Sequence, residues 1–265
     1  MVTVPVPGTE ANAGPSAPRI YDYLIGGHES YAADRALAER LAGEYPGLRA
    51  LARQNRGFIL KAARWTAAMR GTGQFIDLGC GLPAVPALHD AAREAVPLAV
   101  AAYVDRDPEV IMHSRTAYRD VPGLAVVDGD VADPAAVLAD EGLRGVIDLA
   151  RPACAVFGGV LSAMDADAAQ KAVAGFAGAM APGSAVVISC VSYADSGLAE
   201  RMAALFGATG CWQNHGEQDV ASFFAAAKLR LLHGRVMDVS CWPACPAARG
   251  TSAGARVLGG IGIRD

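Results

Sequence analysis

Residues 74–83 read Gln-Phe-Ile-Asp-Leu-Gly-Cys-Gly-Leu-Pro, and the fold class follows from this short stretch. Phe75, Ile76 and Leu78 are the apolar residues of a strand buried on both faces, which Gly79-Cys80-Gly81 ends abruptly before a helical pattern. Glycine lets a ligand approach the backbone closely, because it has no β-carbon and can adopt a positive φ. The turn is therefore predicted to hold a ligand at the carboxyl end of a parallel strand, where open α/β sheets bind their ligands.

Two acidic residues follow the next two apolar runs. Asp105 stands at the end of residues 100–104, at about the distance after the glycine turn where nucleotide-binding folds place a carboxylate for the ribose hydroxyls. Asp130 comes just after residues 124–127 and is placed to accept a hydrogen bond from an adenine amino group. Ala84 occupies the position of the third glycine in the Gly-x-Gly-x-x-Gly pattern of dinucleotide enzymes, so that pattern is incomplete.

With these residues the chain resembles the class I S-adenosylmethionine-dependent methyltransferases. The resemblance assigns residues 77–81 to the methionine side of the cofactor, Asp105 to the ribose, and Asp130 with Val131 to the adenine. The chain is similar in particular to an actinobacterial branch, from Arg19 onward. The motifs that carry this similarity are Arg-Ile-Tyr-Asp-Tyr-Leu-Ile-Gly-Gly at residues 19–27, Ala33-Asp34-Arg35, Asn55-Arg56, Gly81-Leu82-Pro83 and Tyr103-Val104-Asp105.

The residues expected to contact S-adenosylmethionine come from the ends of four strands and from the N-terminal motif. They are Tyr21, Asp77, Gly79, Cys80, Gly81, Asp105, Arg106, Asp130, Val131 and Gly158. Arg106 has two equally open roles, covering the adenine face or forming an exposed salt bridge.

The predicted fold is α/β, with a Rossmann-like seven-stranded, mostly parallel sheet, an antiparallel C-terminal hairpin and an N-terminal helical extension or lid. Further strands are expected at residues 153–157, 185–191, 229–239 and 256–263, and helices at 32–45, 48–69, 85–96, 133–140 and 165–180. The expected organisation is a disordered tail (1–18), the helical lid (19–70) and the cofactor-binding domain (71–265).

Composition excludes several classes of protein. The net charge of −4 and the scattered arginines argue against nucleic acid as a partner. No apolar run approaches the roughly 18 residues of a membrane span, and no signal peptide is visible, so a cytoplasmic protein is expected. The expected oligomeric state is a monomer or a homodimer. Cys241 and Cys245 have half the spacing of a zinc site without a second pair of ligands, so no metal is predicted.

Residues 19–31 gather titratable side chains around Gly26-Gly27, a composition suited to a lid that closes over a ligand and excludes water. Tyr23, His28 and Glu29 are the catalytic candidates of this segment, and His215 and Glu217 are further candidates on a later loop. The alternative is that the tyrosines of residues 19–31 only cover the sheet edge.

Methyl transfer depends mainly on aligning the two reactants, so the sequence need not contain a covalent nucleophile. The predicted acceptor is a small aromatic or heteroaromatic metabolite, with an indole-containing natural product such as a tryptophan-derived cyclic dipeptide as the specific hypothesis. Relatives in the branch often carry His-Phe where this chain has Ser162-Ala163, which predicts a roomier pocket. Two alternatives stay open: a non-catalytic S-adenosylmethionine-binding regulator, and a nicotinamide-dependent dehydrogenase.

Overall fold

One sheet forms the centre of the protein, and the computed structural model describes it within residues 14–243 and 254–265. The eight strands of this part follow the order β3-β2-β1-β4-β5-β8-β6, with β7 pairing with β8. The parallel strands are β1 (Gln74–Leu78), β2 (Val100–Asp105), β3 (Leu124–Asp128), β4 (Cys154–Gly158) and β5 (Ala185–Tyr193). The predicted mostly parallel sheet is confirmed.

The C-terminal part of the sheet is antiparallel, as expected, but it is divided differently. Strand β8 (Ala255–Ile263) runs antiparallel to β5 along its whole length. The apolar run at residues 229–239 forms two short strands, β6 (Arg230–Leu231) and β7 (Met237–Asp238), which both pair with β8. The separation has a local cause, because Gly234 adopts φ 68° in the turn between them.

Alternation along β1 explains why its apolar run is continuous. Phe75 packs into the core on one face of the sheet, whereas Ile76 and Leu78 pack into the core on the other. A parallel strand covered by helices on both faces needs apolar side chains in both directions.

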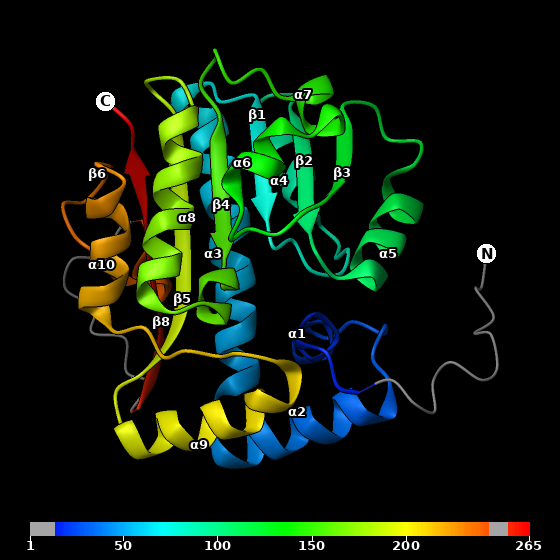
Figure 1. Cartoon of the computed structure of the whole chain (residues 1–265), viewed down its shortest axis with the longest axis vertical. Helices are drawn as coiled ribbons and strands as arrows, with labels where there is room; N and C mark the ends of the chain where they lie inside the picture. Colours follow the sequence, from blue (N-terminus) through cyan, green and yellow to red (C-terminus); the bar gives the residue numbers. More distant parts are fainter. Residues whose placement is uncertain (1–13, 244–253) are drawn as a thin grey trace.

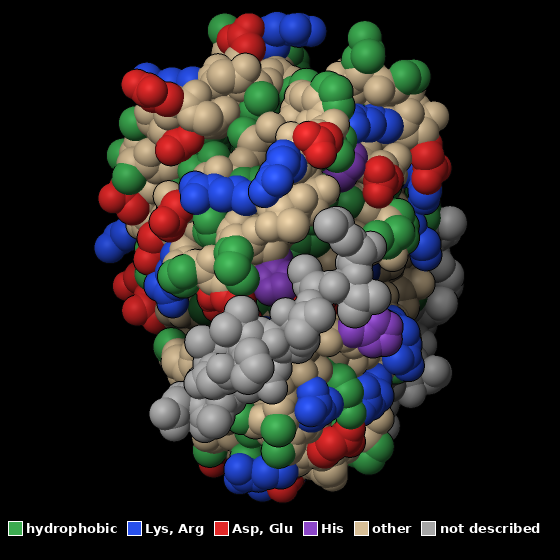
Figure 2. Space-filling view, turned by 90° about the vertical axis from the view of Figure 1, so that its right-hand side faces the viewer, with side chains coloured by type: hydrophobic (Ala, Val, Ile, Leu, Met, Phe, Trp, Pro, Cys, Tyr) green, Lys and Arg blue, Asp and Glu red, His purple; other side chains and the backbone are tan. Residues whose placement is uncertain are grey.

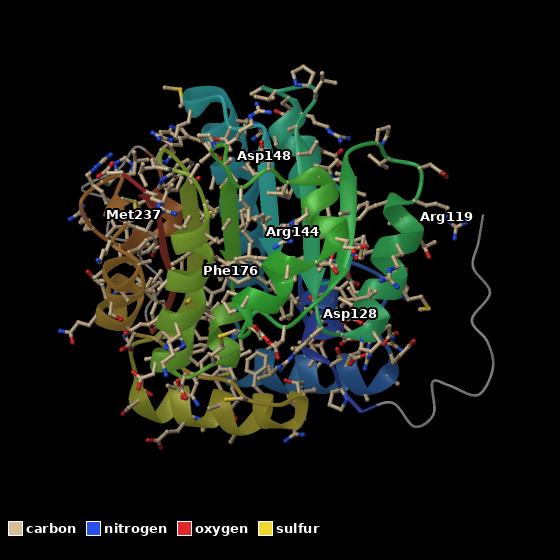
Figure 3. The ribbon with its side chains drawn as sticks, turned by 45° about the horizontal axis from the view of Figure 1, so that its top comes forward. Arg119, Asp128, Arg144, Asp148, Phe176 and Met237 are labelled. Carbon is tan, nitrogen blue, oxygen red and sulfur yellow. The ribbon has the colours of Figure 1, made fainter. Side chains whose placement is uncertain are left out.

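Helices cover both faces of the sheet (Figure 1). The first face carries α3 (Leu48–Arg70) and α4 (Leu88–Arg93), and the second carries α6 (Pro134–Ala139), α7 (Glu141–Val146), α8 (Ala166–Ala179) and α10 (Glu217–Ala226). Helix α5 (Pro108–Tyr118) packs against β2 and β3. Phe176, labelled in Figure 3, belongs to α8 and meets Phe157 of β4 edge to face, with ring centroids 5.8 Å apart.

Three further helices lie beyond the carboxyl ends of the parallel strands: α1 (Ala17–Ile25), α2 (Ala32–Glu44) and α9 (Ser196–Phe206) (Figure 1). Helix α2 contacts α1, α3 and α9, so the N-terminal helices join the main core. Three single 3-10 turns complete the structure: η1 (Val160–Ala163), η2 (Gly207–Thr209) and η3 (Val239–Cys241).

Aspartates mark the starts of three helices, two of which were expected, at residues 133–140 and 165–180. The side chains of Asp107, Asp133 and Asp165 each accept a hydrogen bond from a backbone N–H in the first turn of α5, α6 and α8. The helix expected at residues 85–96 is shorter, since α4 begins at Leu88, after Pro86, and Asp90 accepts a hydrogen bond from the N–H of Ala87 at 2.8 Å.

Parts of the predicted tail and of the late loop lie outside the described residues. These are residues 1–13 and 244–253, which include Cys245. The described chain is already tied to the fold before residue 19, because the N–H of Ser16 donates to Asp34 Oδ1 at 2.9 Å and α1 begins at Ala17. No helix of the described residues combines the length and the apolar character that crossing a bilayer requires. On the face shown in Figure 2, described acidic and basic side chains are interspersed rather than separated by sign.

Candidate functional site

A cavity of roughly 730 Å³ opens where β1, β2 and β4 end. The loops after these strands form one wall, and α1 and α3 form a second. The segment from the end of α9 to residue 213 closes a third side. All ten residues predicted to contact the cofactor line this cavity.

The glycine loop after β1 is shaped by two glycines. Gly79 and Gly81 both adopt φ 66°, which strains residues with a β-carbon. A β-carbon at Gly79 would also collide with the side chain of Val160. The N–H groups of Gly79 and Cys80 donate to the carbonyl of Val104 at 2.8 and 3.0 Å, so the loop is tied to the end of β2. The loop leaves its backbone open to the cavity, as the sequence predicted.

Asp105 joins the loops that follow β1 and β2. One carboxylate oxygen accepts the N–H of Gly81 at 2.9 Å, and the other accepts the N–H of Asp107 at 3.0 Å. Asp105 is buried, and burial raises the pKa of its carboxyl group, while the backbone hydrogen bonds lower it. Each oxygen keeps a further lone pair for a ligand hydroxyl.

Asp77 is a buried acid of the site whose carboxylate receives little stabilisation from the surrounding protein. It is 6% exposed, and no hydrogen bond within the described part of the chain involves its carboxylate. The pKa of Asp77 is raised to about 7, chiefly by burial, with Arg56 opposing the rise and Asp105 adding to it. A cationic ligand group would supply the compensation that the protein itself does not.

Asp130 and Arg106 form the far end of the cavity as an ion pair. Arg106 Nη1 lies 3.0 Å from Asp130 Oδ2, and the N–H of Ala132 donates to Asp130 Oδ1 at 2.8 Å. Partial burial raises the pKa of Asp130, but these hydrogen bonds bring it below its usual value. Val131 is buried beside them and lines the cavity. Of the two roles left open for Arg106, the structure shows the salt bridge.

Gly158 marks the end of β4 at the cavity. A β-carbon there would meet the Cδ1 end of the Ile59 side chain of α3, which would have to shift to make room.

The three catalytic candidates of the N-terminal segment do not line the cavity. Tyr23 donates its hydroxyl to Glu39 Oε1 at 2.7 Å on the outer surface. His28 is exposed, and Glu29 lies 3.8 Å from His113. The face of α1 that borders the cavity carries Ile20, Tyr21 and Leu24 instead. The catalytic role expected of these residues stays a prediction, and their position does not support it.

A buried ionic network holds α1 in place over the cavity. Arg19 Nε donates to Asp34 Oδ2 at 2.7 Å, and Arg19 Nη1 pairs with Glu109 of α5. The backbone N–H of Ser16 donates to the other oxygen of Asp34 at 2.9 Å. Arg19 and Asp34 belong to the N-terminal motifs, and their side chains are 6% and 0% exposed. These motif residues therefore position the helix and do not line the cavity.

The late loop contributes different residues from those expected. His215 is buried, and its Nε2 lies 3.1 Å from the carbonyls of Leu161 and Met164, so it fastens the loop to η1. Glu217 forms an exposed ion pair with Arg256. Neither lines the cavity, whereas Trp212 and Gln213, two to five residues earlier, do.

Trp212 forms the aromatic wall of the cavity with Phe206. Their rings are stacked with centroids 5.5 Å apart and an interplanar angle of 15°. The N–H of Gln213 donates to the carbonyl of Ser162 at 2.7 Å, which brings this wall against η1. The sequence pointed to His215 and Glu217 of this loop but could not tell which of the loop's side chains face the cavity, because that depends on where α9 places them.

A family model described as S-adenosyl methyltransferase matches residues 10–265. The crystal structure of a protein from Thermobifida fusca YX, provisionally assigned as a methyltransferase, has 31% identity and a TM-score of 0.88 over 100% of both chains. A DUF574 family protein from Streptomyces avermitilis MA-4680 has 27% identity and a TM-score of 0.86, covering 95% of this chain and 98% of that chain.

More distant structures share the fold alone. One is the 1,6-didemethyltoxoflavin N1-methyltransferase of Burkholderia thailandensis, with 16% identity and a TM-score of 0.51 over 96% of this chain and 93% of that chain. No curated protein matches the chain.

Proposed function

The chain belongs to the S-adenosyl methyltransferase family and is an S-adenosylmethionine-dependent methyltransferase, and we propose that its acceptor is a small, uncharged aromatic molecule. Indole-containing natural products, including tryptophan-derived cyclic dipeptides, are the first compounds of this class to test. The observation that carries the proposal is one cavity in which an uncompensated acid and an open glycine loop stand together with an aromatic wall.

The cavity residues fit S-adenosylmethionine. Asp77 offers an unpartnered carboxylate to a positively charged group, and Asp105 offers its remaining lone pairs to ribose hydroxyls. Asp130 and Val131 border the position expected for adenine. When bound, the cofactor supplies an electrophilic methyl group on a positively charged sulfur. The chain's own contribution is to hold both ligands, exclude water and align them, which in well-oriented models is worth on the order of 7 to 11 kcal/mol.

The composition of the cavity wall supports an aromatic acceptor. Trp212 and Phe206 present stacked rings, and Leu24, Leu48 and Val191 add apolar surface. Flat rings bind such surfaces through burial and stacking. Ser162 and Ala163, from which the sequence predicted a roomier pocket, line the cavity with small side chains, and this favours a bicyclic ring system.

The charges of the wall support an uncharged acceptor. Among the described residues that line the cavity, Arg56 and Arg106 are the only basic ones. Arg56 donates to the carbonyls of Ala84 and Pro86 at 3.3 and 2.6 Å, and Arg106 is paired with Asp130. Neither is left to compensate a buried carboxylate or phosphate of an acceptor.

The N-terminal helices serve, in this proposal, as the lid of the cofactor-binding domain. Ser16, Tyr21 and Leu24 line the cavity although they precede the sheet. The two relatives named above come from Thermobifida and Streptomyces, both actinobacterial genera, which supports assigning the chain to the actinobacterial branch marked by residues 19–27.

Calorimetric titration with S-adenosylmethionine, S-adenosylhomocysteine and NAD is the first test. Micromolar binding of the two sulfur compounds and none of NAD is expected. Aromatic metabolites and cyclic dipeptides are then screened for a mass gain of one methyl group, beside matched carboxylated analogues. Methylation confined to the carboxylated analogues would refute the uncharged acceptor, and binding of NAD alone would refute the cofactor site.

A further inference from the structure

A chain of hydrogen bonds crosses from the sheet to α1 at the cavity wall. Ser189 Oγ of β5 donates to Asn55 Oδ1 at 2.6 Å, and Asn55 Nδ2 donates to the hydroxyl of Tyr21 at 3.0 Å. The Tyr21 hydroxyl donates in turn to the carbonyl of Ala52 at 3.2 Å. Ser189 is fully buried and Asn55 is 3% exposed, so bulk water does not compete for these bonds.

The direction of each bond follows from the chemistry of its ends. The Gly158 carbonyl can only accept and lies 3.5 Å from Asn55 Nδ2, which favours the orientation in which the nitrogen of the Asn55 amide faces it. The same nitrogen then donates to Tyr21. The carbonyl of Ala52 also can only accept, so the phenolic proton of Tyr21 is used there. The Tyr21 oxygen is left with one lone pair and no proton to give.

The position of that lone pair is defined by its neighbours. Tyr21, Asn55 and Gly158 all line the cavity, and Gly158 ends β4 beside the glycine loop. Burial raises the pKa of Tyr21, so the phenol stays protonated near neutral pH and is a hydrogen-bond acceptor rather than a base. Asp77 and Asp105 already offer carboxylates to the cofactor from the loops after β1 and β2.

We propose that the Tyr21 oxygen accepts a hydrogen bond from an N–H or O–H group of the methyl acceptor, and that Asn55 and Ser189 are positioning residues that fix its direction. This proposal rests on the proposed function and deepens it, because it adds a hydrogen-bond donor to the uncharged aromatic acceptor. The bond orients the acceptor and moves no proton. This moves Tyr21, which the sequence assigned to the cofactor, to the acceptor. The cofactor's ammonium and hydroxyl groups are also donors, so the test must separate the two sources.

The experiment compares indole, which has an N–H, with 1-methylindole, which lacks it, by NMR titration of the protein saturated with S-adenosylhomocysteine. Wild type is expected to bind indole roughly 2- to 10-fold more tightly than 1-methylindole, the range of a single neutral hydrogen bond. Tyr21→Phe should bring this ratio of the two indole affinities close to one and should leave the affinity for S-adenosylhomocysteine within about twofold of wild type. Tyr23→Phe is the matched control, since its hydroxyl lies on the same helix outside the cavity, and it should keep the wild-type ratio.

Three results would overturn the inference. A Tyr21→Phe protein that loses affinity for S-adenosylhomocysteine but still discriminates the two indoles would assign the hydroxyl to the cofactor. A wild type that binds both indoles equally, or neither, would mean that the Tyr21 oxygen holds no N–H. The cofactor titration and the turnover screen would still test the proposed function independently. Ser189→Ala should lower the ratio in the same direction as Tyr21→Phe, and an unchanged ratio would remove Asn55 and Ser189 from the assignment.

Discussion

Replacing Asp77 with asparagine should make the free protein more stable and the cofactor complex weaker. The substitution keeps the size of the side chain and removes its charge. Folding takes the Asp77 carboxyl group from an ordinary pKa of 3.8 to about 7, because burial disfavours its charged form. The folded protein therefore binds more protons than the unfolded chain between these two values. Stability that is present below pH 4 is lost as the pH rises towards 7.

The magnitude follows from the difference in pKa. A pKa difference of roughly three corresponds to about 4 kcal/mol over the whole window, of which about 2 to 3 kcal/mol falls between pH 5 and pH 8. Urea unfolding of the wild type and of Asp77→Asn at these two pH values measures this difference. The free energy of unfolding of the variant, relative to wild type, should rise by about 2 to 3 kcal/mol between pH 5 and pH 8.

Cofactor affinity should depend on pH in the opposite sense to the stability of the free protein, rising as the pH rises. Because the ionised carboxylate is the form that attracts a cation, wild-type affinity for S-adenosylmethionine should fall up to about tenfold per pH unit below pH 7. Asp77→Asn should bind roughly 10- to 150-fold more weakly at pH 8, the worth of one charge-assisted hydrogen bond, with little dependence on pH. Equal pH slopes for wild type and variant in both unfolding and calorimetry would show that Asp77 is not the titrating group, and the cofactor placement would lose its main support.

Three other substitutions test the rest of the site. Asp105→Asn keeps one acceptor for the two backbone N–H groups but loses the charge, so S-adenosylhomocysteine should bind roughly 10-fold or more weakly in calorimetry; an unchanged affinity would move the ribose elsewhere. Gly79→Ala strains a positive φ and collides with Val160, so the variant should lose cofactor binding and melt several degrees lower than wild type. Cofactor binding at the wild-type affinity would contradict the loop geometry. Arg19→Met leaves Asp34 as a buried charge without its cation, which should cost about 3 to 5 kcal/mol in urea unfolding, and the added Asp34→Asn change should recover part of it.

The sheet was predictable because its signals are local. The alternation of Phe75 and Ile76 between two cores, the glycine turn and the aspartate caps all depend on residues a few positions apart. The failures were also local in origin: proline and an aspartate cap shorten α4, and a glycine turn divides residues 229–239 into two strands. Periodicity alone does not report such interruptions.

The cavity wall formed by the loops after β1, β2, β3 and β4 was equally predictable from the sequence, since loops that follow adjacent parallel strands meet at one edge of the sheet. The opposite wall was not. Tyr21 and Tyr23 are two positions apart on one helix, yet one lines the cavity and the other bonds to Glu39 on the outer surface. Their sequence context is the same, so only the packing of α1 distinguishes them.

By itself the sequence determined the α/β fold, the cofactor and the carboxylates that line the cavity, because strand patterns, glycine turns and caps depend on near neighbours. The tertiary structure decided which motif residues hold α1 in place and which line the cavity. Arg19 meets Glu109 across 90 positions of sequence, and Ser189 fixes Asn55 across 134. Contacts over such separations form only when the whole core is packed, so the burial that leaves Asp77 uncompensated and the direction of the Tyr21 hydrogen bonds are properties of the folded protein.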